Sequence, residues 1–92
     1  MTKQEKLNWI IEYIRDNGWR DVYMEDFVNS YIDNCNPKNV GYVLWGAPKV
    51  PELNRYLSEL YKNGVLKRFT VGLHNCHDSV SMPKWVYGYK IK

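Results

Sequence analysis

Residues 49–92 constrain the fold of this chain more than any other stretch. Residues 49–63 are predicted to form an amphipathic helix, because apolar side chains recur there at intervals of three and four. These apolar residues are Val50, Leu53, Leu57 and Leu60. Two strand-like segments follow at 65–71 and 84–92, and they enclose a polar loop at 72–83. A helix that runs into a two-stranded ribbon predicts an α+β unit whose helix and ribbon tip point to the same side.

The two strand-like segments each have two distinguishable faces. Residues 84–92 alternate strictly, which is typical of a half-buried strand. One face carries Trp85, Tyr87, Tyr89 and Ile91, and the other carries Lys84, Val86, Gly88, Lys90 and Lys92. In residues 65–71, Val65, Lys67, Phe69 and Val71 share one face, and Leu66 and Arg68 share the other.

The first part of the chain predicts two further helices. Residues 3–17 are expected to be helical, because Thr2 and Glu5 have the spacing of a capping box and Gly18 suits a left-handed stop. The inward side of this helix carries Leu7, Ile10, Ile11 and Ile14. Residues 19–23 are too few for a helix and predict a brief extended segment. A second amphipathic stretch then places Phe27, Val28, Tyr31 and Ile32 on one side.

The segment 36–48 interrupts this helical pattern. Pro37 ends the preceding helix, because the residue before a proline is disfavoured in helical geometry. We interpret the segment as an ordered insertion, with room for one helical turn, anchored by Leu44 or Trp45. The alternative is a loop that binds a partner, for which Tyr42 and Trp45 are the candidate contact residues.

Length and composition favour one domain over residues 1–92. The chain has four Trp and eight Tyr, and large rings help a small core because each buries much area. Trp19, Trp45 and Trp85 are therefore assigned to the core. No segment approaches the ~18 apolar residues of a membrane helix, and no leader is visible, so we expect a cytoplasmic protein, and a nuclear location fits equally well. Cys35 and Cys76 fit reduced thiols in that compartment.

Charge is distributed unevenly along the chain. Residues 1–35 carry four Lys/Arg and seven Asp/Glu, whereas residues 36–70 carry six against two. Residues 71–92 carry three against one. Such polarity favours orientation in the field of a polyanion, and the competing interpretation is an ordinary uneven surface.

The order helix, short strand, helix, helix, strand, loop, strand resembles the winged helix-turn-helix superfamily. The segment PELNRYLSELYKNGVLKRF is similar to small bacterial and phage regulators of that superfamily. In those regulators a glycine, two apolar residues and a basic strand follow the third helix, and Gly64 is that glycine here. The segment KWVYGYKI resembles the strand that returns from the wing. The resemblance implies a recognition helix at 49–63 in the major groove and a wing at 72–83 on the backbone.

The resemblance also implies which side chains meet DNA. The groove-side candidates are Lys49, Asn54, Arg55, Ser58 and Lys62, and the ribbon candidates for phosphates are Lys67, Arg68 and Lys84. Arg and Asn can form paired hydrogen bonds to guanine and adenine, and Lys and Ser supply phosphate contacts. Glu52 and Glu59 on the same helix would repel phosphates if they faced DNA. For Lys67 and Arg68, the competing interpretation is a charged edge strand that prevents aggregation.

The loop at 72–83 also contains residues with metal-binding and nucleophilic chemistry. His74, Cys76 and His77 lie close together, but they lack the separated ligand pairs of zinc sites. Adjacent Cys76 and His77 give poor catalytic geometry, and no oxyanion or phosphate cradle is visible. We therefore expect no metal, no cofactor and no enzyme activity.

The sequence thus favours a sequence-specific duplex DNA-binding protein, a regulator of transcription or of phage or plasmid DNA. One small copy buries too little interface for high specificity, so a homodimer is expected, with its seam on the first helix at an exposed Trp9 or Tyr13. The alternative is a winged-helix adaptor that binds a protein, such as a host factor.

Overall fold

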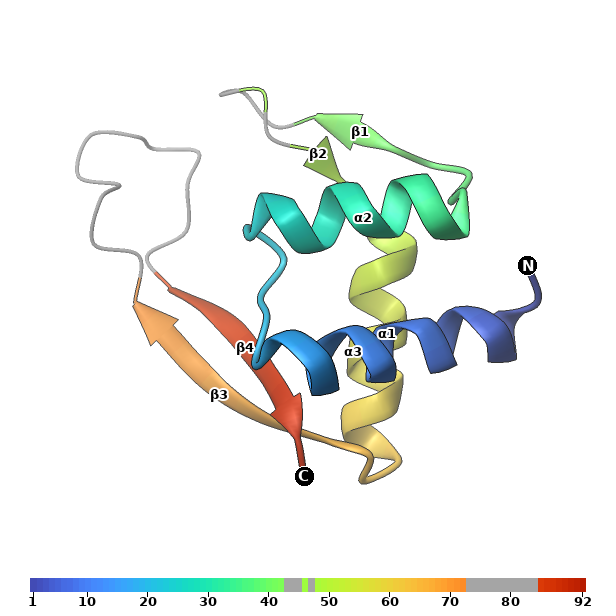
Figure 1. Cartoon of the computed structure of the whole chain (residues 1–92). Coiled ribbons are helices and arrows are strands. Elements are labelled where there is room, and N and C mark those ends of the chain that lie inside the picture. Colours follow the sequence, from blue (N-terminus) through green and yellow to red (C-terminus); the bar gives the residue numbers. More distant parts are fainter. Residues whose placement is uncertain (43–45, 47, 73–84) are drawn as a thin grey trace.

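The protein has an α+β fold, in which three helices and two small antiparallel sheets are found among the described residues. The computed structural model describes residues 1–42, 46, 48–72 and 85–92. The elements are α1 (Lys3–Asn17), α2 (Glu25–Cys35), β1 (Gly41–Tyr42), β2 (Pro48–Lys49), α3 (Pro51–Lys62), β3 (Leu66–Gly72) and β4 (Trp85–Ile91). Figure 1 shows the helices grouped together, with the β3–β4 ribbon on one side and β1 and β2 beside α2.

The helix ends follow from local sequence. The Thr2 hydroxyl accepts a hydrogen bond from the Glu5 amide at 3.2 Å, and the Glu5 carboxylate accepts one from the Thr2 amide at 2.9 Å. This capping box confirms the predicted start of α1, and Gly18, with φ of 88°, ends it. Pro51 occupies the first turn of α3, where its missing N–H costs nothing. Lys49 belongs to β2, so the helix predicted from residue 49 begins at Pro51.

The core lies where the three helices meet the ribbon. The predicted inward stripes are confirmed for most positions, and Ile11 and Ile32 are only half-buried. The buried core consists of Leu7, Ile10, Ile14, Phe27, Val28, Tyr31, Cys35, Val50, Leu53, Leu57, Leu60, Leu66 and Tyr89. Burial of this apolar surface is the main force that holds the helices and the ribbon together.

The ribbon is an antiparallel pair whose register runs from Leu66 opposite Ile91 to Gly72 opposite Trp85. Directly opposite residues share a face, so Leu66 and Tyr89 define the inner ribbon face, which packs on the core. Arg20 forms an isolated bridge to Tyr89, with backbone N···O distances of 3.0 and 2.9 Å. This bridge confirms the brief extended segment predicted at 19–23 only at Arg20, because Val22 and Tyr23 form a turn.

Some aromatic residues lie elsewhere than predicted. Trp19 is 37% exposed and Trp85 is 50% exposed, so their assignment to the core is wrong. Trp19 packs edge-on against Phe69 on the outer ribbon face, with ring centroids 5.1 Å apart. Gly88 leaves the space for that ring, because a Cβ there would lie 2.6 Å from Phe69 Cζ.

Trp9 and Tyr13 are half-buried rather than exposed. Trp9 stacks on Tyr13 and Phe27, with ring centroids 5.1 and 6.1 Å away, so the two residues help to join α1 to α2. The Tyr13 hydroxyl also donates to Asp26 at 2.7 Å. The premise of an exposed dimer seam at these two rings is therefore wrong, and dimerisation itself stays a prediction.

The described part of the insertion at 36–48, together with Lys49, forms a short β-hairpin of β1 and β2. Gly41 pairs with Lys49 and Tyr42 pairs with Pro48, and no described residue of the segment is helical. Leu44 and Trp45, the predicted anchors, lie outside the described residues. Tyr42 is 72% exposed, as a partner-contact residue would have to be.

Candidate nucleic-acid interface

The outward side of α3 brings four of the predicted site residues together. Asn54, Arg55 and Lys62 are exposed and Ser58 is half-buried, and all four line one shallow depression along the helix. We call these four residues the α3 surface. They gather because Leu53, Leu57 and Leu60 bury the opposite side of the same helix.

The two acidic residues of α3 are turned toward α1 and are both paired. Lys6 Nζ lies 3.0 Å from Glu52 Oε2, and Lys3 Nζ lies 2.8 Å from Glu59 Oε1. The Tyr31 hydroxyl also donates to Glu52 at 2.6 Å. Although Glu59 still borders the depression, its charge is offset at short range by Lys3. The repulsion of phosphates expected from these carboxylates is therefore reduced.

The Glu52 network is partly buried and electrostatically coupled. Burial alone would raise the pKa of Glu52, but hydrogen bonds from Tyr31 and Lys6 hold that pKa below its ordinary value of 4.5. Burial and the Glu52 carboxylate together raise the pKa of Tyr31, which keeps its hydroxyl protonated as a donor. Glu52 is thus an ionised structural residue that fixes the side of α3 facing α1.

A second hollow lies between α3 and β4. Asn54 and Ser58 form its helix wall, and Trp85, Tyr87 and Tyr89 contribute its ribbon wall. Trp85 and Tyr87 meet edge to face, with ring centroids 4.9 Å apart. The α3 surface therefore continues onto the inner ribbon face through a mainly aromatic wall.

Arg68 joins the ribbon to α3 on this same side. Its guanidinium carbon lies 4.0 Å from the ring centroids of both Tyr61 and Tyr87. We call Tyr61, Arg68 and Tyr87 the Arg68 stack. The planar guanidinium keeps its N–H donors at its edge when rings cover its two faces, so a stacked arginine can still bind a phosphate.

Lys49 lies at the other end of the α3 surface. With Asn54 it lines a small pocket of about 150 Å³ between α2, β2 and the start of α3. Five of the predicted residues, Lys49, Asn54, Arg55, Ser58 and Lys62, thus border adjoining depressions. Lys84 lies outside the described residues.

Lys67 does not belong to this surface. It alternates with Leu66 and Arg68 along β3, and its cross-strand neighbour is Lys90, so it projects from the outer ribbon face. Of the predicted DNA-contact residues, Arg55 and Lys62 therefore share the α3 surface, and Lys67 lies on a different face.

Sequence reasoning missed the residues that prepare this surface. Lys3 and Lys6 neutralise the α3 carboxylates, and Tyr61 and Tyr87 hold Arg68. One signal was available, because Lys3 and Lys6 are three residues apart on one helix and Glu52 and Glu59 are seven apart on another. Both spacings place charges on a single helix side.

The described residues give no sign of a metal centre or a membrane span. No group of three metal-binding side chains occurs among them, and His74, Cys76 and His77 lie outside them. None of the described helices has the length and apolar character to cross a bilayer. No family model, curated protein or solved structure matches this chain.

Proposed function

We propose that this chain is a winged-helix protein that binds duplex DNA and acts as a regulator of bacterial or phage type. The observation that carries the proposal is the division of charge on α3, where Glu52 and Glu59 pair with α1 and Arg55 and Lys62 face outward. The order α1, Arg20 bridge, α2, α3, β3, β4 supports the winged-helix assignment, with the β1–β2 pair inserted between α2 and α3.

In the proposed mechanism, α3 enters the major groove and the ribbon follows the backbone beside it. In this mechanism Arg55 and Asn54 form base-edge hydrogen bonds, and Lys62 and Ser58 supply phosphate contacts; all four line one depression. Arg68, fixed between its two tyrosines, binds a phosphate next to the helix. The Arg68 stack keeps α3 and the ribbon at a constant separation, which lets one duplex meet both.

The test is duplex binding measured by fluorescence anisotropy over a range of salt concentrations. The logarithm of the affinity should fall linearly with the logarithm of salt, because each phosphate contact releases counterions. Arg55→Ala with Lys62→Ala should weaken binding and lower the steepness of this line by about 1, because Lys62 meets a phosphate whereas Arg55 contacts a base edge. Arg15→Ala, which removes an exposed cation from the last turn of α1, is the matched control for Arg55→Ala.

Two outcomes would contradict the proposal. The first is the absence of a duplex-dependent signal at low salt. The second is an equal loss of affinity in Arg55→Ala and Arg15→Ala, which would mean that net charge and not the α3 surface governs binding.

A protein-binding adaptor is the second candidate, and the exposure of Tyr42 favours it. A tyrosine that is 72% exposed on a short hairpin is a typical interface anchor, because a large ring can bury much area on contact. Tyr42→Ala should leave duplex binding unchanged if the hairpin serves a separate protein partner. A loss of duplex binding in Tyr42→Ala would instead place the hairpin in the DNA interface.

A further inference from the structure

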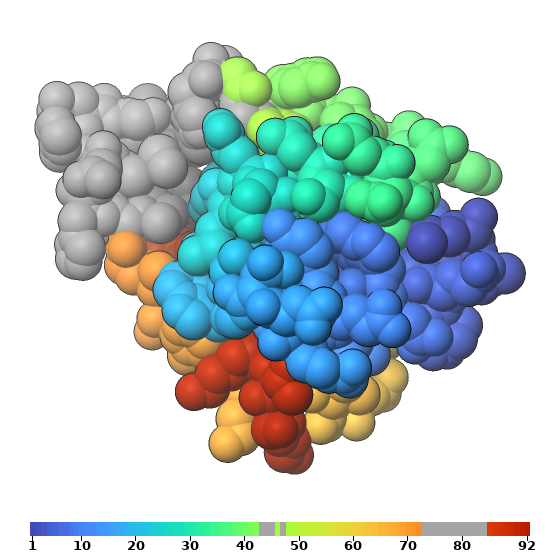
Figure 2. All heavy atoms as spheres, in the orientation of Figure 1, coloured from blue at the N-terminus to red at the C-terminus, as the bar shows by residue number. Residues whose placement is uncertain are grey.

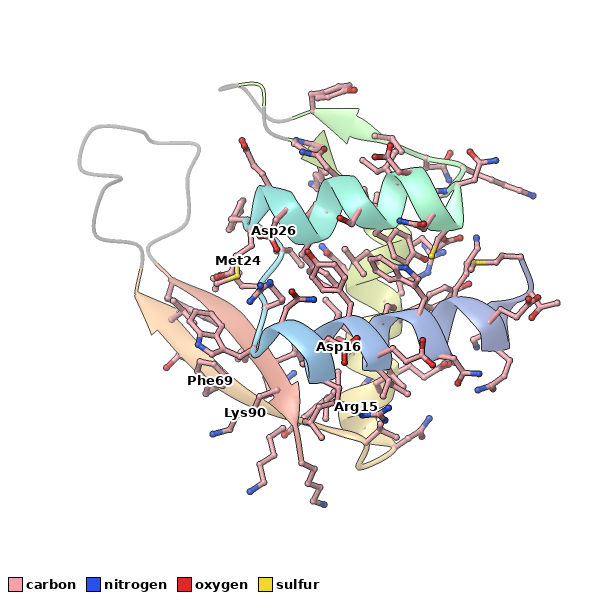
Figure 3. All side chains as sticks on the ribbon, viewed as in Figure 1. Arg15, Asp16, Met24, Asp26, Phe69 and Lys90 are labelled. Carbon is pink, nitrogen blue, oxygen red and sulfur yellow. The ribbon has the colours of Figure 1, made fainter. Side chains whose placement is uncertain are left out.

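The outer ribbon face carries two lysines directly opposite each other. Lys67 on β3 and Lys90 on β4 are cross-strand partners, both are exposed, and their side chains project from the same face. Like charges placed directly opposite each other destabilise an antiparallel pair. In Figure 3, Lys90 extends from the ribbon away from the helices.

This repulsion is not offset within the described part of the chain. The ion pairs found there use Lys3, Lys6 and Arg20, and none uses Lys67 or Lys90. The Lys90 ammonium instead lies 5.6 Å from the ring centroid of Phe69, a cation–π distance. Figure 2 shows the end of β4, in red, at the surface below α1.

Protection of a sheet edge explains only one of the two lysines. β3 has one strand neighbour among the described residues, so Lys67 can serve as an edge charge that blocks strand addition. Lys90 lies on β4, which pairs with β3 on one edge and is bridged by Arg20 at the adjacent Tyr89 on the other, so edge protection accounts for Lys90 less directly. The pair therefore needs another reason, and a bound polyanion supplies one because it would neutralise both charges.

Aromatic side chains adjoin these lysines. Phe69 and Trp19 lie on the same outer face, and Trp19 is 37% exposed. Figure 3 shows Phe69 and Lys90 near each other on the ribbon. Cations beside a flat apolar surface suit the phosphates and sugars of a nucleic-acid backbone better than a small free anion.

We propose that the outer ribbon face, centred on Lys67 and Lys90, binds the phosphate backbone of a second DNA segment. The inner ribbon face packs toward α3, so a duplex on the α3 surface and a duplex on the outer face approach the ribbon from opposite sides. One molecule thereby bridges two segments. This inference rests on the proposed DNA-binding function for the first segment.

The test compares binding of one duplex with capture of a second. A biotinylated duplex on beads is loaded with protein, and retention of a second, fluorescent duplex is measured, while anisotropy gives the affinity for a single duplex. Lys67→Gln with Lys90→Gln should reduce capture at least about fivefold and change single-duplex affinity less than about threefold, since two contacts to the second segment are lost. Arg15→Gln with Lys38→Gln removes the same charge from other exposed positions and should retain capture.

Sedimentation of the free proteins must show the same oligomeric state in all variants, because a dimer can also join two duplexes. Unchanged capture by Lys67→Gln with Lys90→Gln overturns the inference. An equal loss of capture and of single-duplex binding also overturns it, because the lysines would then belong to the first site. If the wild-type protein binds one duplex through the α3 surface and captures no second, only this inference fails. If it binds no duplex, the proposed function fails as well.

Discussion

Replacement of Arg68 should show how firmly the ribbon is attached to α3. The guanidinium carbon lies 4.0 Å from two ring centroids, and the side chain is half-buried. Each cation–π contact contributes about 0.5–2 kcal/mol, depending on how far it is desolvated. Arg68→Ala should therefore lower the free energy of unfolding by about 2 kcal/mol, which corresponds to roughly 8–16 °C in Tm for a domain of this size.

Further variants separate stacking from charge. Arg68→Lys keeps the charge but loses the planar stack, so it should recover only part of the lost stability. Lys67→Ala, its neighbour on the outer ribbon face, is the matched control and should change stability by less than about 0.5 kcal/mol, or raise it by relieving the repulsion of Lys90. A double-mutant cycle with Tyr61→Leu, which removes the α3 ring of the stack, should give a coupling energy of about 0.5–1.5 kcal/mol.

Urea unfolding followed by tryptophan fluorescence provides these free energies. A cost below about 0.5 kcal/mol for Arg68→Ala would refute the reasoning, because such a value is ordinary for a surface substitution. A coupling energy near zero in the Tyr61 cycle would show that the cost does not come from the contact between Arg68 and α3. In either case the Arg68 stack would not be what keeps α3 and the ribbon together.

Three other predictions follow from particular contacts. Gly88→Ala should destabilise the protein by about 1–3 kcal/mol in urea unfolding, and Phe69→Leu added to it should restore part of that loss by removing the ring that the new Cβ meets at 2.6 Å. Lys6→Met should cost about 1–3 kcal/mol at neutral pH, because it leaves the half-buried Glu52 without its cation. The fold lowers the pKa of Glu52, so the Lys6–Glu52 pair stabilises the protein fully above the ordinary value of 4.5 and ceases to do so as pH falls through the lowered value. The difference in free energy of unfolding between Lys6→Met and the wild type should therefore shrink over that acid range. A difference that stays constant would contradict this prediction. Burial raises the pKa of Cys35 to about 11, so alkylation of this thiol should be slow in the native state and should accelerate in proportion to unfolding by urea. Peptide mapping measures the alkylation at Cys35, and rapid labelling of the native protein would contradict its burial.

The helices were predictable because their signals are local. The Thr2 capping box, Gly18 and the three- and four-residue spacing of apolar side chains act within one or two turns. The hairpin of β1 and β2 was not predictable in the same way. It consists of two residue pairs, Gly41 with Lys49 and Tyr42 with Pro48, and strands this short carry no alternation to detect.

The ribbon shows a different limit of sequence reasoning. Alternation assigned its residues to the correct two faces, and the observed register agrees with that assignment. Alternation alone does not reveal how deeply each position is buried. Arg68 shares the inner face with Leu66, and tyrosines from α3 and β4 contact its guanidinium there. Trp85 is on the same face, but it lines the open hollow beside Asn54 and Ser58 and remains 50% exposed.

The uneven charge of the sequence also changes meaning in the folded chain. Counted along the sequence, the first third is acidic and the rest is basic, which predicts a molecule with an acidic end and a basic end. The fold instead pairs Lys3 and Lys6 of the acidic third with Glu59 and Glu52 of the basic part. In each pair the lysine offsets the negative charge of a glutamate near the α3 surface, although the lysine is not itself part of that surface. The electrostatic potential around α3 is therefore more positive than a count of the charged residues of α3 implies. Substitution of Lys3, which is not part of the α3 surface, should still weaken duplex binding, because the charge of Glu59 would no longer be offset.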